Sequence, residues 1–381
     1  MSQRPLVVVT TSFPVAGDGS EAAGSFVADL VEELARHAPV RVVAPGSEAG
    51  QEQWSSRIEV HRYAAPARPL STLKPWKPSD LAWLMRVLRG GARATLAAAG
   101  RDAGHILALW GLPCGEWARR AAETHGIGYS VWMLGSDVWS LGRIPLLRGA
   151  LANVIRKADH AYADGYKLTE DAQRIAGTGR VRFLPSTRRI DLRDPPPPRS
   201  RPPYRLLFLG RWHPNKGVDL LLDALELLEQ DDWERIERLE IQGGGAMEPL
   251  VRERVSVLRQ AGKPVEAGNY LSKPEAEAAI ARADWVLIPS RIESIPVVFS
   301  DAMKLGRPVV AMPVGDLPQL IKDADCGVCA RSVDAEALAQ GIRSALQRNR
   351  GDWPRGVGMQ AARFDLQEIA GRIWNSLGQS A

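Results

Sequence analysis

The stretch from Pro289 to Val310 reads P-S-R-I-E-S-I-P-V-V-F-S-D-A-M-K-L-G-R-P-V-V. Its pattern predicts the end of a strand, a loop, a short helix and a second strand. Glu293 falls on the loop, and Asp301, eight positions later, falls on the helix. The sequence therefore places two carboxylates close to a single strand-to-helix turn.

The ends of this short helix are marked by residue type. Ser294 can cap it and Pro296 can set the backbone of its first turn, whereas Gly306 is typical of its end. The free N–H groups of residues 295–297 would then point out of the strand end, where an α/β fold places an anion such as a phosphate. Two acceptor side chains beside a phosphate suit a nucleotide sugar. The alternative is an ordinary βαβ unit with two solvated acids.

The segment resembles the E-x7-E signature of the retaining glycosyltransferases of family 4, which have the GT-B fold. Asp301 stands where that family has its second Glu, and its side chain is one methylene shorter. The resemblance implies an α/β protein with two doubly wound, Rossmann-like parallel-sheet domains facing a cleft. It also implies transfer of a sugar with retention at the anomeric carbon and without a metal ion.

Composition is that of a globular protein. The chain has 381 residues, of which 45% are hydrophobic and 24% charged, with a net charge of +5. No apolar run approaches the ~18 residues that a membrane span needs, and we expect no signal peptide. Three cysteines favour a reducing compartment, so we expect a cytoplasmic protein, for which the inner face of the membrane is one location. No zinc-finger or aromatic RNA-binding pattern is present, so we expect no nucleic-acid partner.

A proline-rich stretch, Asp194–Pro203, is the plainest boundary. Proline at this density blocks helix and sheet, so a semi-rigid spacer is predicted. Strands alternating with helices on both sides indicate parallel sheets covered on both faces. We expect an acceptor-side domain over 1–194 and a nucleotide-sugar domain over 203–353, with a C-terminal helix within 354–381 that the resemblance implies crosses back onto the first domain. The expected strands are 5–10, 40–44, 58–63, 106–110, 129–133, 160–163, 205–210, 238–241, 285–288, 308–311 and 327–330.

A basic loop follows the first strand of the second half. Gly210–Gly217 reads G-R-W-H-P-N-K-G, and Arg211 and Lys216 can together neutralise a diphosphate. This resembles the G-R-x4-K-G motif of the same family, in which the pair binds the donor diphosphate and supports the leaving group. The alternative is a solvated basic loop.

Glycines follow other strands and could let the backbone approach a ligand or simply make turns. Gln242–Gly245 is similar to a nucleotide-side loop of the family, and Gly24 lies after the first strand. Glu21-Ala22 replaces the Gly-Gly pair that the family usually has there. With the resemblance, the expected donor-binding residues are Gly24, Gly210, Gly243, Gly244, Ser294, Ile295, Pro296, Val297 and Asp301.

Two segments of the first half could contact the sugar acceptor. Leu134–Asp137 resembles the family's H-G-S-D with Leu134 in place of His, and Asp137 could orient an acceptor hydroxyl or cap a helix. Ala108–Gly115 resembles an acceptor-side loop, in which Trp110 offers a stacking face. The expected catalytic residues are Arg211, Lys216, Glu293 and Asp137, with Glu293 holding sugar hydroxyls and Asp301 the ribose.

Other motifs point elsewhere. Asp323-Ala324-Asp325 matches a D-x-D metal motif but lies in a surface-type turn, and Cys326–Cys329 has redox spacing where an ordinary turn and strand are expected. No G-x-G-x-x-G or Walker A motif is present, which disfavours a two-domain dehydrogenase. We therefore expect no metal and no cofactor, only a nucleotide-sugar co-substrate with UDP or GDP as carrier.

Pro75–Arg93 joins Trp, Leu and Met to basic residues. Such a segment can lie in a membrane interface, and the alternative is an amphipathic helix packed on a sheet. The expected partners are thus a nucleotide sugar, a glycan or lipid-linked acceptor and a possible peripheral membrane surface. A non-catalytic GT-B-like subunit of a glycan assembly complex is the other hypothesis. Leu134 and Glu21-Ala22 favour it, whereas the intact Arg211, Lys216 and Glu293 oppose it.

Overall fold

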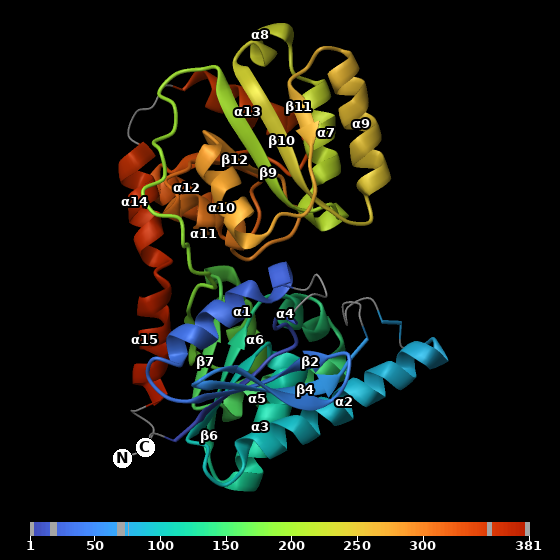
Figure 1. Cartoon of the computed structure of the whole chain (residues 1–381), viewed down its shortest axis with the longest axis vertical. Coiled ribbons are helices and arrows are strands. Elements are labelled where there is room, and N and C mark those ends of the chain that lie inside the picture. Colours follow the sequence, from blue (N-terminus) through green and yellow to red (C-terminus); the bar gives the residue numbers. More distant parts are fainter. Residues whose placement is uncertain (1–3, 16–20, 67–72, 75, 349–352, 378–381) are drawn as a thin grey trace. The chain divides into compact units, whose positions relative to one another are not determined.

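The computed structural model describes residues 4–15, 21–66, 73–74, 76–348 and 353–377. The chain divides into two compact units (Figure 1), the first made of Met1–Arg188 with Leu366–Ala381 and the second of Arg189–Asp365. Each unit is an α/β domain built on one sheet.

The first unit contains an eight-stranded sheet in the order β3-β4-β2-β1-β5-β6-β7-β8. Neighbouring strands are parallel except for β3, which runs antiparallel to β4. Its strands are β1 (Leu6–Val9), β2 (Val40–Gly46), β3 (Gly50–Ser55), β4 (Ile58–Ala64), β5 (His105–Leu109), β6 (Gly128–Met133), β7 (His160–Ala163) and β8 (Val181–Phe183).

Helices cover both faces of this sheet, so its central strands are buried along their whole length rather than on alternate residues. All four residues of β1 and all five of β5 are buried. The helical segments are α1 (Glu21–Leu34), α2 (Pro78–Ala99), η2 (Gly111–Gly115), α3 (Glu116–His125), α4 (Ser136–Trp139), η3 (Leu141–Arg143), α5 (Pro145–Lys157), α6 (Tyr166–Ala176) and α15 (Leu366–Leu377).

The second unit contains a six-stranded, wholly parallel sheet in the order β11-β10-β9-β12-β13-β14. Its strands are β9 (Tyr204–Arg211), β10 (Ile236–Gly244), β11 (Val265–Ala267), β12 (Trp285–Ile288), β13 (Val309–Ala311) and β14 (Gly327–Cys329). Its helices are η4 (Pro214–Lys216), α7 (Val218–Glu226), α8 (Gln230–Trp233), α9 (Glu248–Gln260), α10 (Lys273–Arg282), α11 (Val297–Lys304), α12 (Leu317–Ala324), α13 (Ala335–Gln347) and α14 (Trp353–Arg363).

Both sheets are doubly wound, as predicted. In each, the chain builds outward from a central strand in one direction and then returns to that strand to build in the other. The reversal occurs between β1 and β5 in the first unit and between β9 and β12 in the second. Loops at such a switch point are where open α/β sheets bind ligands.

The proline-rich stretch is not a spacer between the units, contrary to the prediction. The Asp284 carboxylate accepts a hydrogen bond from the Arg199 N–H at 2.7 Å, and the Arg307 guanidinium donates to the Pro196 carbonyl. Glu277 accepts from the N–H groups of Asp191 and Leu192 at 3.0 and 2.9 Å. These buried charged groups fasten the stretch to the second unit, and the division falls after Arg188 instead of at residues 194–203.

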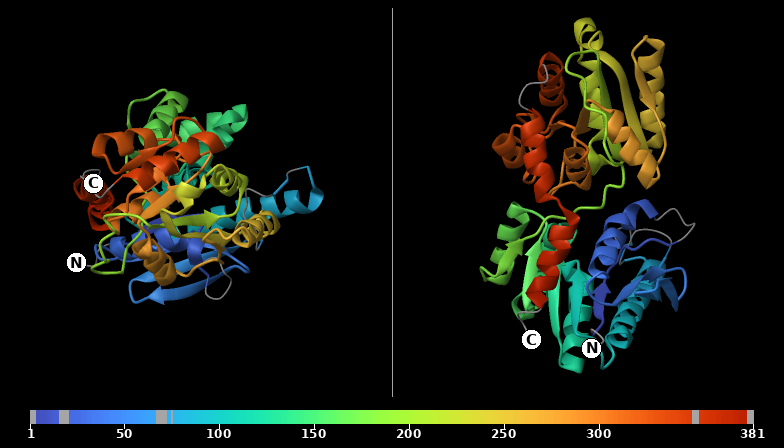
Figure 2. Two further views of the ribbon diagram at one scale, coloured as in Figure 1. Left: turned by 90° about the horizontal axis from the view of Figure 1, so that it is seen from above. Right: turned by 60° about the vertical axis from the view of Figure 1, so that its left-hand side comes forward.

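The predicted C-terminal helix is two helices. α14 stays with the second unit, where Trp353 packs edge-on against Trp285 with ring centroids 5.1 Å apart. α15 belongs to the first unit, where Trp374 stacks on His37 at 5.5 Å and the Tyr162 hydroxyl donates to Ser376 Oγ at 2.7 Å. Figure 2 shows the break between the two helices. The returning element therefore begins at Leu366 rather than at residue 354.

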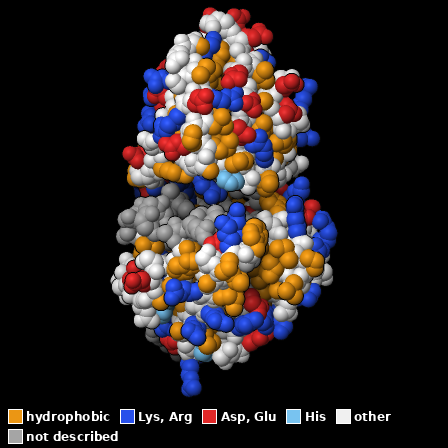
Figure 3. Space-filling view, turned by 90° about the vertical axis from the view of Figure 1, so that its right-hand side faces the viewer, with side chains coloured by type: hydrophobic (Ala, Val, Ile, Leu, Met, Phe, Trp, Pro, Cys, Tyr) orange, Lys and Arg blue, Asp and Glu red, His pale blue; other side chains and the backbone are white. Residues whose placement is uncertain are grey.

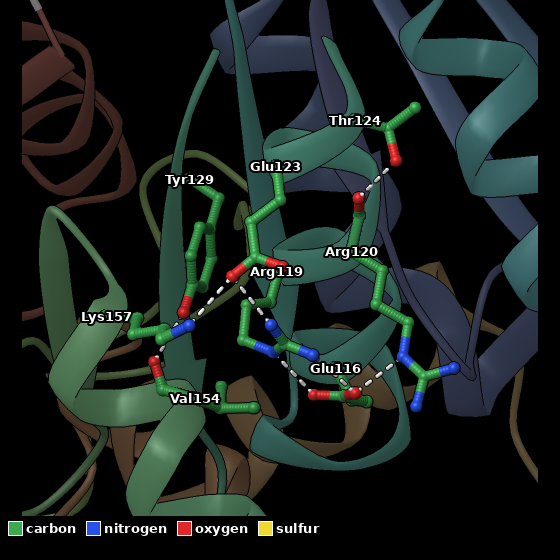
Figure 4. Close-up of polar contacts among 8 residues, drawn as sticks. All are labelled: Glu116, Arg119, Arg120, Glu123, Thr124, Tyr129, Val154 and Lys157. Atoms are coloured by element: carbon green, nitrogen blue, oxygen red, sulfur yellow. Dashed lines mark hydrogen bonds and ion pairs between the residues drawn. The ribbon is translucent and has the colours of Figure 1, made fainter. Parts of the chain in front are cut away.

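Helix α3 presents a charged outer face that is cross-linked by ion pairs (Figure 4). Glu116 accepts from Arg119 and Arg120 at 2.8 and 2.6 Å, and Glu123 accepts from Arg119 at 2.7 Å and from Lys157 of α5 at 2.9 Å. Most of these pairs have the i,i+3 or i,i+4 spacing that stabilises a helix by a few tenths of a kcal/mol each. The Lys157 contact adds a tie between α3 and α5.

A buried histidine makes the stability of the first unit depend on pH. Burial lowers the pKa of His105 to about 4, with a further contribution from His160, and its Nε2 lies 2.8 Å from Ser130 Oγ. The unfolded chain binds a proton near pH 6.5 that the folded chain does not bind until about pH 4. The contribution of neutral His105 to the free energy of unfolding is therefore complete above pH 6.5 and is lost as the pH falls from 6.5 to about 4.

We predict that the free energy of unfolding falls by up to roughly 3 kcal/mol between pH 6.5 and 4 on account of His105. Urea unfolding across this range would measure it. The pH slope should decrease in His105→Gln and persist in His125→Gln, a control at a partly exposed position on α3. Equal slopes in all three proteins would contradict the prediction.

Candidate active site

Two loops meet at the switch point of the second sheet. β9 and β12 are adjacent parallel strands, with Leu206 paired to Trp285, so their carboxyl ends lie side by side. The loop after β9 carries Lys216, and the loop after β12 carries Glu293. The Lys216 ammonium forms an ion pair with Glu293 Oε1, and the Ser290 hydroxyl donates to the same oxygen at 2.9 Å. The structure thus brings together two residues that are 77 positions apart.

The second predicted cation has no protein partner. Arg211 ends β9 with an exposed side chain, and its guanidinium makes no hydrogen bond or ion pair within the described part of the chain. Lys216 and Glu293 are partly buried, at 28% and 13% side-chain exposure. The loop after β9 therefore presents one uncompensated positive charge and one that a carboxylate already neutralises. A diphosphate is a ligand of matching charge.

Glycines allow the loops at this end of the sheet to pack closely. Gly217 has a φ of +67°, and a Cβ there would lie 1.9 Å from the Pro289 carbonyl oxygen. Gly243 has a φ of +148°, and its Cβ would lie 1.9 Å from the Gly210 carbonyl oxygen. Neither position admits another residue without moving the backbone. Backbone packing thus explains Gly217 and Gly243 without a ligand.

Tyr270 covers the next glycine. Its hydroxyl donates to the Gly244 carbonyl at 2.7 Å, and a Cβ on Gly244 would lie 2.7 Å from the ring. The ring is 59% exposed, so it offers an aromatic face beside the loop after β10. The sequence carried only a weak signal for it, since a lone Tyr after a short strand has no motif.

The start of α11 differs from the prediction. The helix begins at Val297 with Pro296 as its N-cap residue, so Pro296 does not lie in the first turn. The Ser294 hydroxyl is buried, makes no hydrogen bond with a described residue and does not cap the helix. The Val297 and Val298 N–H groups lie in the first turn, where no helical acceptor exists for them. The prediction named the N–H groups of residues 295–297, so only Val297 of that set lies in the first turn.

The remaining donor-side predictions fall around α11. Ile295 is buried, and the Asp301 side chain lies on the inner face of the helix at 1% exposure. Gly306 ends the helix with a φ of +75°, as predicted, and its N–H bonds the Met303 carbonyl at 3.1 Å. Asp301 is therefore a buried residue of α11 and not one of two solvated acids.

Three predicted residues belong to the first unit. A Cβ on Gly24 would lie 2.7 Å from Pro14, so this glycine lets α1 pack against the loop after β1. Trp110 follows β5 with a φ of +72°, a conformation that costs a non-glycine residue about 1–3 kcal/mol and that recurs at functional sites. Its ring packs edge-on against Phe26 with centroids 6.2 Å apart and is half-buried.

Asp137 is buried and accepts hydrogen bonds from backbone N–H groups of two loops, whereas its assignment as a catalytic residue stays a prediction. One oxygen accepts from the N–H groups of Leu134, Gly135 and Val138 at 3.3, 3.1 and 3.1 Å. The other accepts from the Gly111 N–H at 2.6 Å. Burial raises the pKa of the carboxyl group, and the hydrogen bonds from the Gly111, Leu134 and Val138 N–H groups oppose that change. Asp137 thus ties the loop after β6 to the loop that contains Trp110.

The other motifs give no metal or redox site. Within the described residues, no three His, Cys, Asp or Glu side chains are grouped to hold a metal ion. Asp325 adopts the left-handed conformation at the end of α12, which is a turn role. Burial raises the pKa of the Cys326 thiol to about 12, which makes it unreactive. Glu21 and Ala22 begin α1.

Sequence reasoning missed Arg291 and Asp219. The Arg291 guanidinium donates to both oxygens of Asp219 at 2.8 and 2.7 Å and to the Pro214 carbonyl at 2.6 Å. These contacts join the loop of Glu293 to the loop of Lys216. The available signal was an arginine three positions after the end of β12 and two positions before a motif carboxylate.

Residues 203–348 match the family model described as glycosyl transferases group 1. This segment is therefore similar to glycosyl transferases group 1. The match covers most of the second unit and includes Arg211, Lys216, Glu293 and Asp301.

Relatives with assigned names extend the likeness. A D-inositol 3-phosphate glycosyltransferase of Geodermatophilus obscurus is 33% identical over 149 residues, which are 38% of this chain and 33% of that protein. A GDP-mannose-dependent alpha-(1-6)-phosphatidylinositol monomannoside mannosyltransferase of Mycolicibacterium smegmatis is 26% identical over 97% of this chain and 93% of its own. The chain spans only about a third of the length of the first two curated relatives that it matches, both D-inositol 3-phosphate glycosyltransferases.

Solved structures show the fold. Sucrose-phosphate synthase of Thermosynechococcus elongatus has a TM-score of 0.72 and 17% identity, with all of both chains covered. Anabaena Alr3699/HepE in complex with UDP-glucose also has a TM-score of 0.72, with 15% identity over 99% of this chain and all of that one. The protein has the GT-B fold, as the sequence predicted.

We predict that Asp137→Ala lowers the free energy of unfolding by about 3 kcal/mol or more, because buried N–H donors lose their acceptor. Urea denaturation would measure the loss. Asp171→Ala is a matched control, since Asp171 lies on α6 of the same unit and accepts from Trp139 Nε1 and Arg174 near the surface. An Asp137 variant of unchanged stability would return this residue to the list of catalytic candidates.

Proposed function

We propose that this protein is a retaining glycosyltransferase that moves a sugar from a nucleoside diphosphate to an acceptor hydroxyl. The observation that carries the proposal is the meeting of Lys216 and Glu293 at the switch point of the second sheet, next to the unpaired Arg211. The match of residues 203–348 to the family model of glycosyl transferases group 1 supports it.

Arg211 and Lys216 would bind the diphosphate and stabilise the negative charge that develops on it. Such electrostatic stabilisation of a leaving group is worth several kcal/mol. On donor binding, Lys216 would exchange part of its contact with Glu293 for a phosphate oxygen. Glu293 would then accept hydrogen bonds from sugar hydroxyls, and Asp301 would serve the ribose.

The reaction would take place on one face of the sugar. The acceptor oxygen forms a bond to the anomeric carbon while the bond from that carbon to the diphosphate oxygen breaks. The hydroxyl proton passes to the departing phosphate oxygen, so no metal or protein base is needed to balance the step. Because Asp137 is occupied by backbone donors, we give it no part in this transfer.

The names of the relatives support UDP or GDP as the carrier. The M. smegmatis relative is called GDP-mannose-dependent, and a structural neighbour was solved with UDP-glucose. The same relative acts, by its name, on a phosphatidylinositol monomannoside, which favours a glycan or lipid-linked acceptor here. Trp110 would offer such an acceptor its ring.

A non-catalytic GT-B-like subunit is the second candidate. Leu134 and the Glu21-Ala22 pair favour it, because they depart from residues that the glycosyltransferase family uses around the donor. Donor turnover separates the two candidates, because only an enzyme would hydrolyse the nucleotide sugar or transfer its sugar.

We predict that one of UDP or GDP stabilises the wild type in a thermal-shift experiment and has a much smaller effect on Lys216→Ala. A ligand at 100 times its dissociation constant adds about 2.7 kcal/mol. Lys322→Ala, which removes the same charge from an exposed position on α12 of the same unit, should respond like the wild type. Sugar transfer should fall about 10²-fold or more in Lys216→Ala.

The outcomes decide between the candidates. No shift with either nucleotide, together with no turnover of any UDP- or GDP-sugar, would reject the enzyme in favour of the subunit. Equal shifts and equal turnover in all three proteins would remove Lys216 from the site.

We also propose peripheral contact with an anionic membrane through α2, at the cytoplasmic face. Among the described helices, none is long and apolar enough to cross a bilayer. Trp76, Leu81 and Met85 are nevertheless 76%, 45% and 40% exposed. Leu81, Met85 and the basic Arg89 recur every four residues and so share one stripe of the helix.

The surrounding charges favour an anionic surface over an apolar protein partner. Lys and Arg side chains lie beside exposed apolar ones on the face toward which α2 extends (Figure 3). Apolar side chains beside basic ones are the combination that binds a headgroup region. The basic residues of this segment are Lys74, Lys77, Arg86, Arg89 and Arg93.

We predict that the wild type floats with vesicles of phosphatidylcholine and phosphatidylglycerol at low salt, and not with phosphatidylcholine alone. The double variant Leu81→Glu with Met85→Glu should stay in the soluble fraction. Val257→Glu, at a 58% exposed position on α9, controls for added charge. Failure of the wild type to float, or flotation of the double variant, would reject the membrane contact.

A further inference from the structure

We infer that Arg291 and Asp219 form a clamp that positions Lys216 and Glu293 for the donor diphosphate. The inference rests on the proposed function, and it adds two positioning residues that lie outside the family motifs. Its basis is the set of contacts that Arg291 makes across the two loops of the site.

Arg291, on the loop after β12, makes hydrogen bonds to the turn η4 on the loop after β9. Its backbone N–H donates to the Asn215 carbonyl at 2.8 Å. Its Nη1 donates to the Pro214 carbonyl at 2.6 Å, and its Nη1 and Nη2 meet both Asp219 oxygens at 2.8 and 2.7 Å. One residue of the Glu293 loop therefore holds the start of the Lys216 turn and the first turn of α7 at once.

The turn that carries Lys216 needs such support. η4 is a single turn of three residues, closed by hydrogen bonds from Lys216 N to His213 O and from Gly217 N to Pro214 O at 2.8 and 3.1 Å. A turn of this length is weakly cooperative. A lysine is also a point charge on a flexible stem, so the position of its ammonium group depends on where the backbone is held.

Arg291 is positioned to hold the loop and not to bind the donor. Its two terminal nitrogens are engaged with Asp219 and Pro214, in contrast to Arg211, whose guanidinium has no partner in the described structure. Burial acts to raise the pKa of Asp219, but the hydrogen bonds from Arg291 bring it below its ordinary value. The Asp219 carboxylate is therefore ionised at neutral pH and can hold the Arg291 guanidinium in place.

The geometry requires arginine specifically. A guanidinium can donate two parallel bonds to a carboxylate and a third to a carbonyl at the same time, which an ammonium cannot do in this arrangement. Lysine at position 291 would keep the charge and lose the fork. If Arg291 acts through its charge alone, Arg291→Lys should behave like the wild type. If Arg291 positions the loop, Arg291→Lys should lose that effect.

We predict that Arg291→Lys and Asp219→Asn each lower kcat about tenfold or more, with a smaller change in KM. The reason is that a displacement of about 1 Å in a catalytic group can cost up to 10² in rate. Hydrogen exchange should also become faster at the amides of residues 215–217, in the absence of any substrate.

A second arginine clamp in the same unit provides the control. Arg254 of α9 pairs with Asp223 and Glu226 of α7. Arg254→Lys and Glu226→Gln should change thermal stability about as much as the clamp variants do, while kcat and exchange at residues 215–217 stay as in the wild type.

The two readouts separate failure of the clamp from failure of the proposed function. Unchanged exchange at residues 215–217 in Arg291→Lys and Asp219→Asn would overturn the clamp, whatever the activity. Wild-type kcat in both variants would also overturn it. Faster exchange in a protein whose wild type neither binds nucleotide nor transfers sugar would instead leave the clamp standing and reject the proposed function.

Discussion

The site depends on one constraint of parallel sheets, which is that adjacent strands end at the same edge. β9 and β12 are neighbours in space and are separated in sequence by β10, β11 and their helices. Their loops must therefore leave the sheet side by side, and Lys216 meets Glu293 there. Gly217 permits this approach, because a side chain at that position would collide with Pro289.

Charge is distributed unevenly at this edge. Glu293 neutralises Lys216, whereas Arg211 remains exposed and unpaired in the described structure. Under the proposed function, an incoming diphosphate would bind the unpaired Arg211 directly and would compete with the Glu293 carboxylate for Lys216. The ion pair with Glu293 holds the Lys216 ammonium in place before a ligand arrives. It can do so only if Arg291 also holds the backbone of the Lys216 loop.

Buried carboxylates elsewhere accept hydrogen bonds from backbone N–H groups in loops and near the ends of helices and strands. Asp137 accepts four N–H groups of two loops, and Asp284 accepts those of Arg199 and Arg205. Glu277 does the same for the start of the proline-rich stretch. These residues resemble catalytic acids in the sequence, and only their partners distinguish them from Glu293.

The sequence by itself determined the strands that are apolar throughout, such as Leu6–Val9 and Trp285–Ile288, the end of α11 at Gly306 and the doubly wound class. These features follow from local residue pattern, burial and turn chemistry. The tertiary structure alone decided that the polar strand Gly50–Ser55 pairs with β4, that the tail divides before Leu366 and that Arg291 spans to Asp219. Each of these depends on partners that no local pattern specifies, because the pairing energy comes from residues brought together only by the fold.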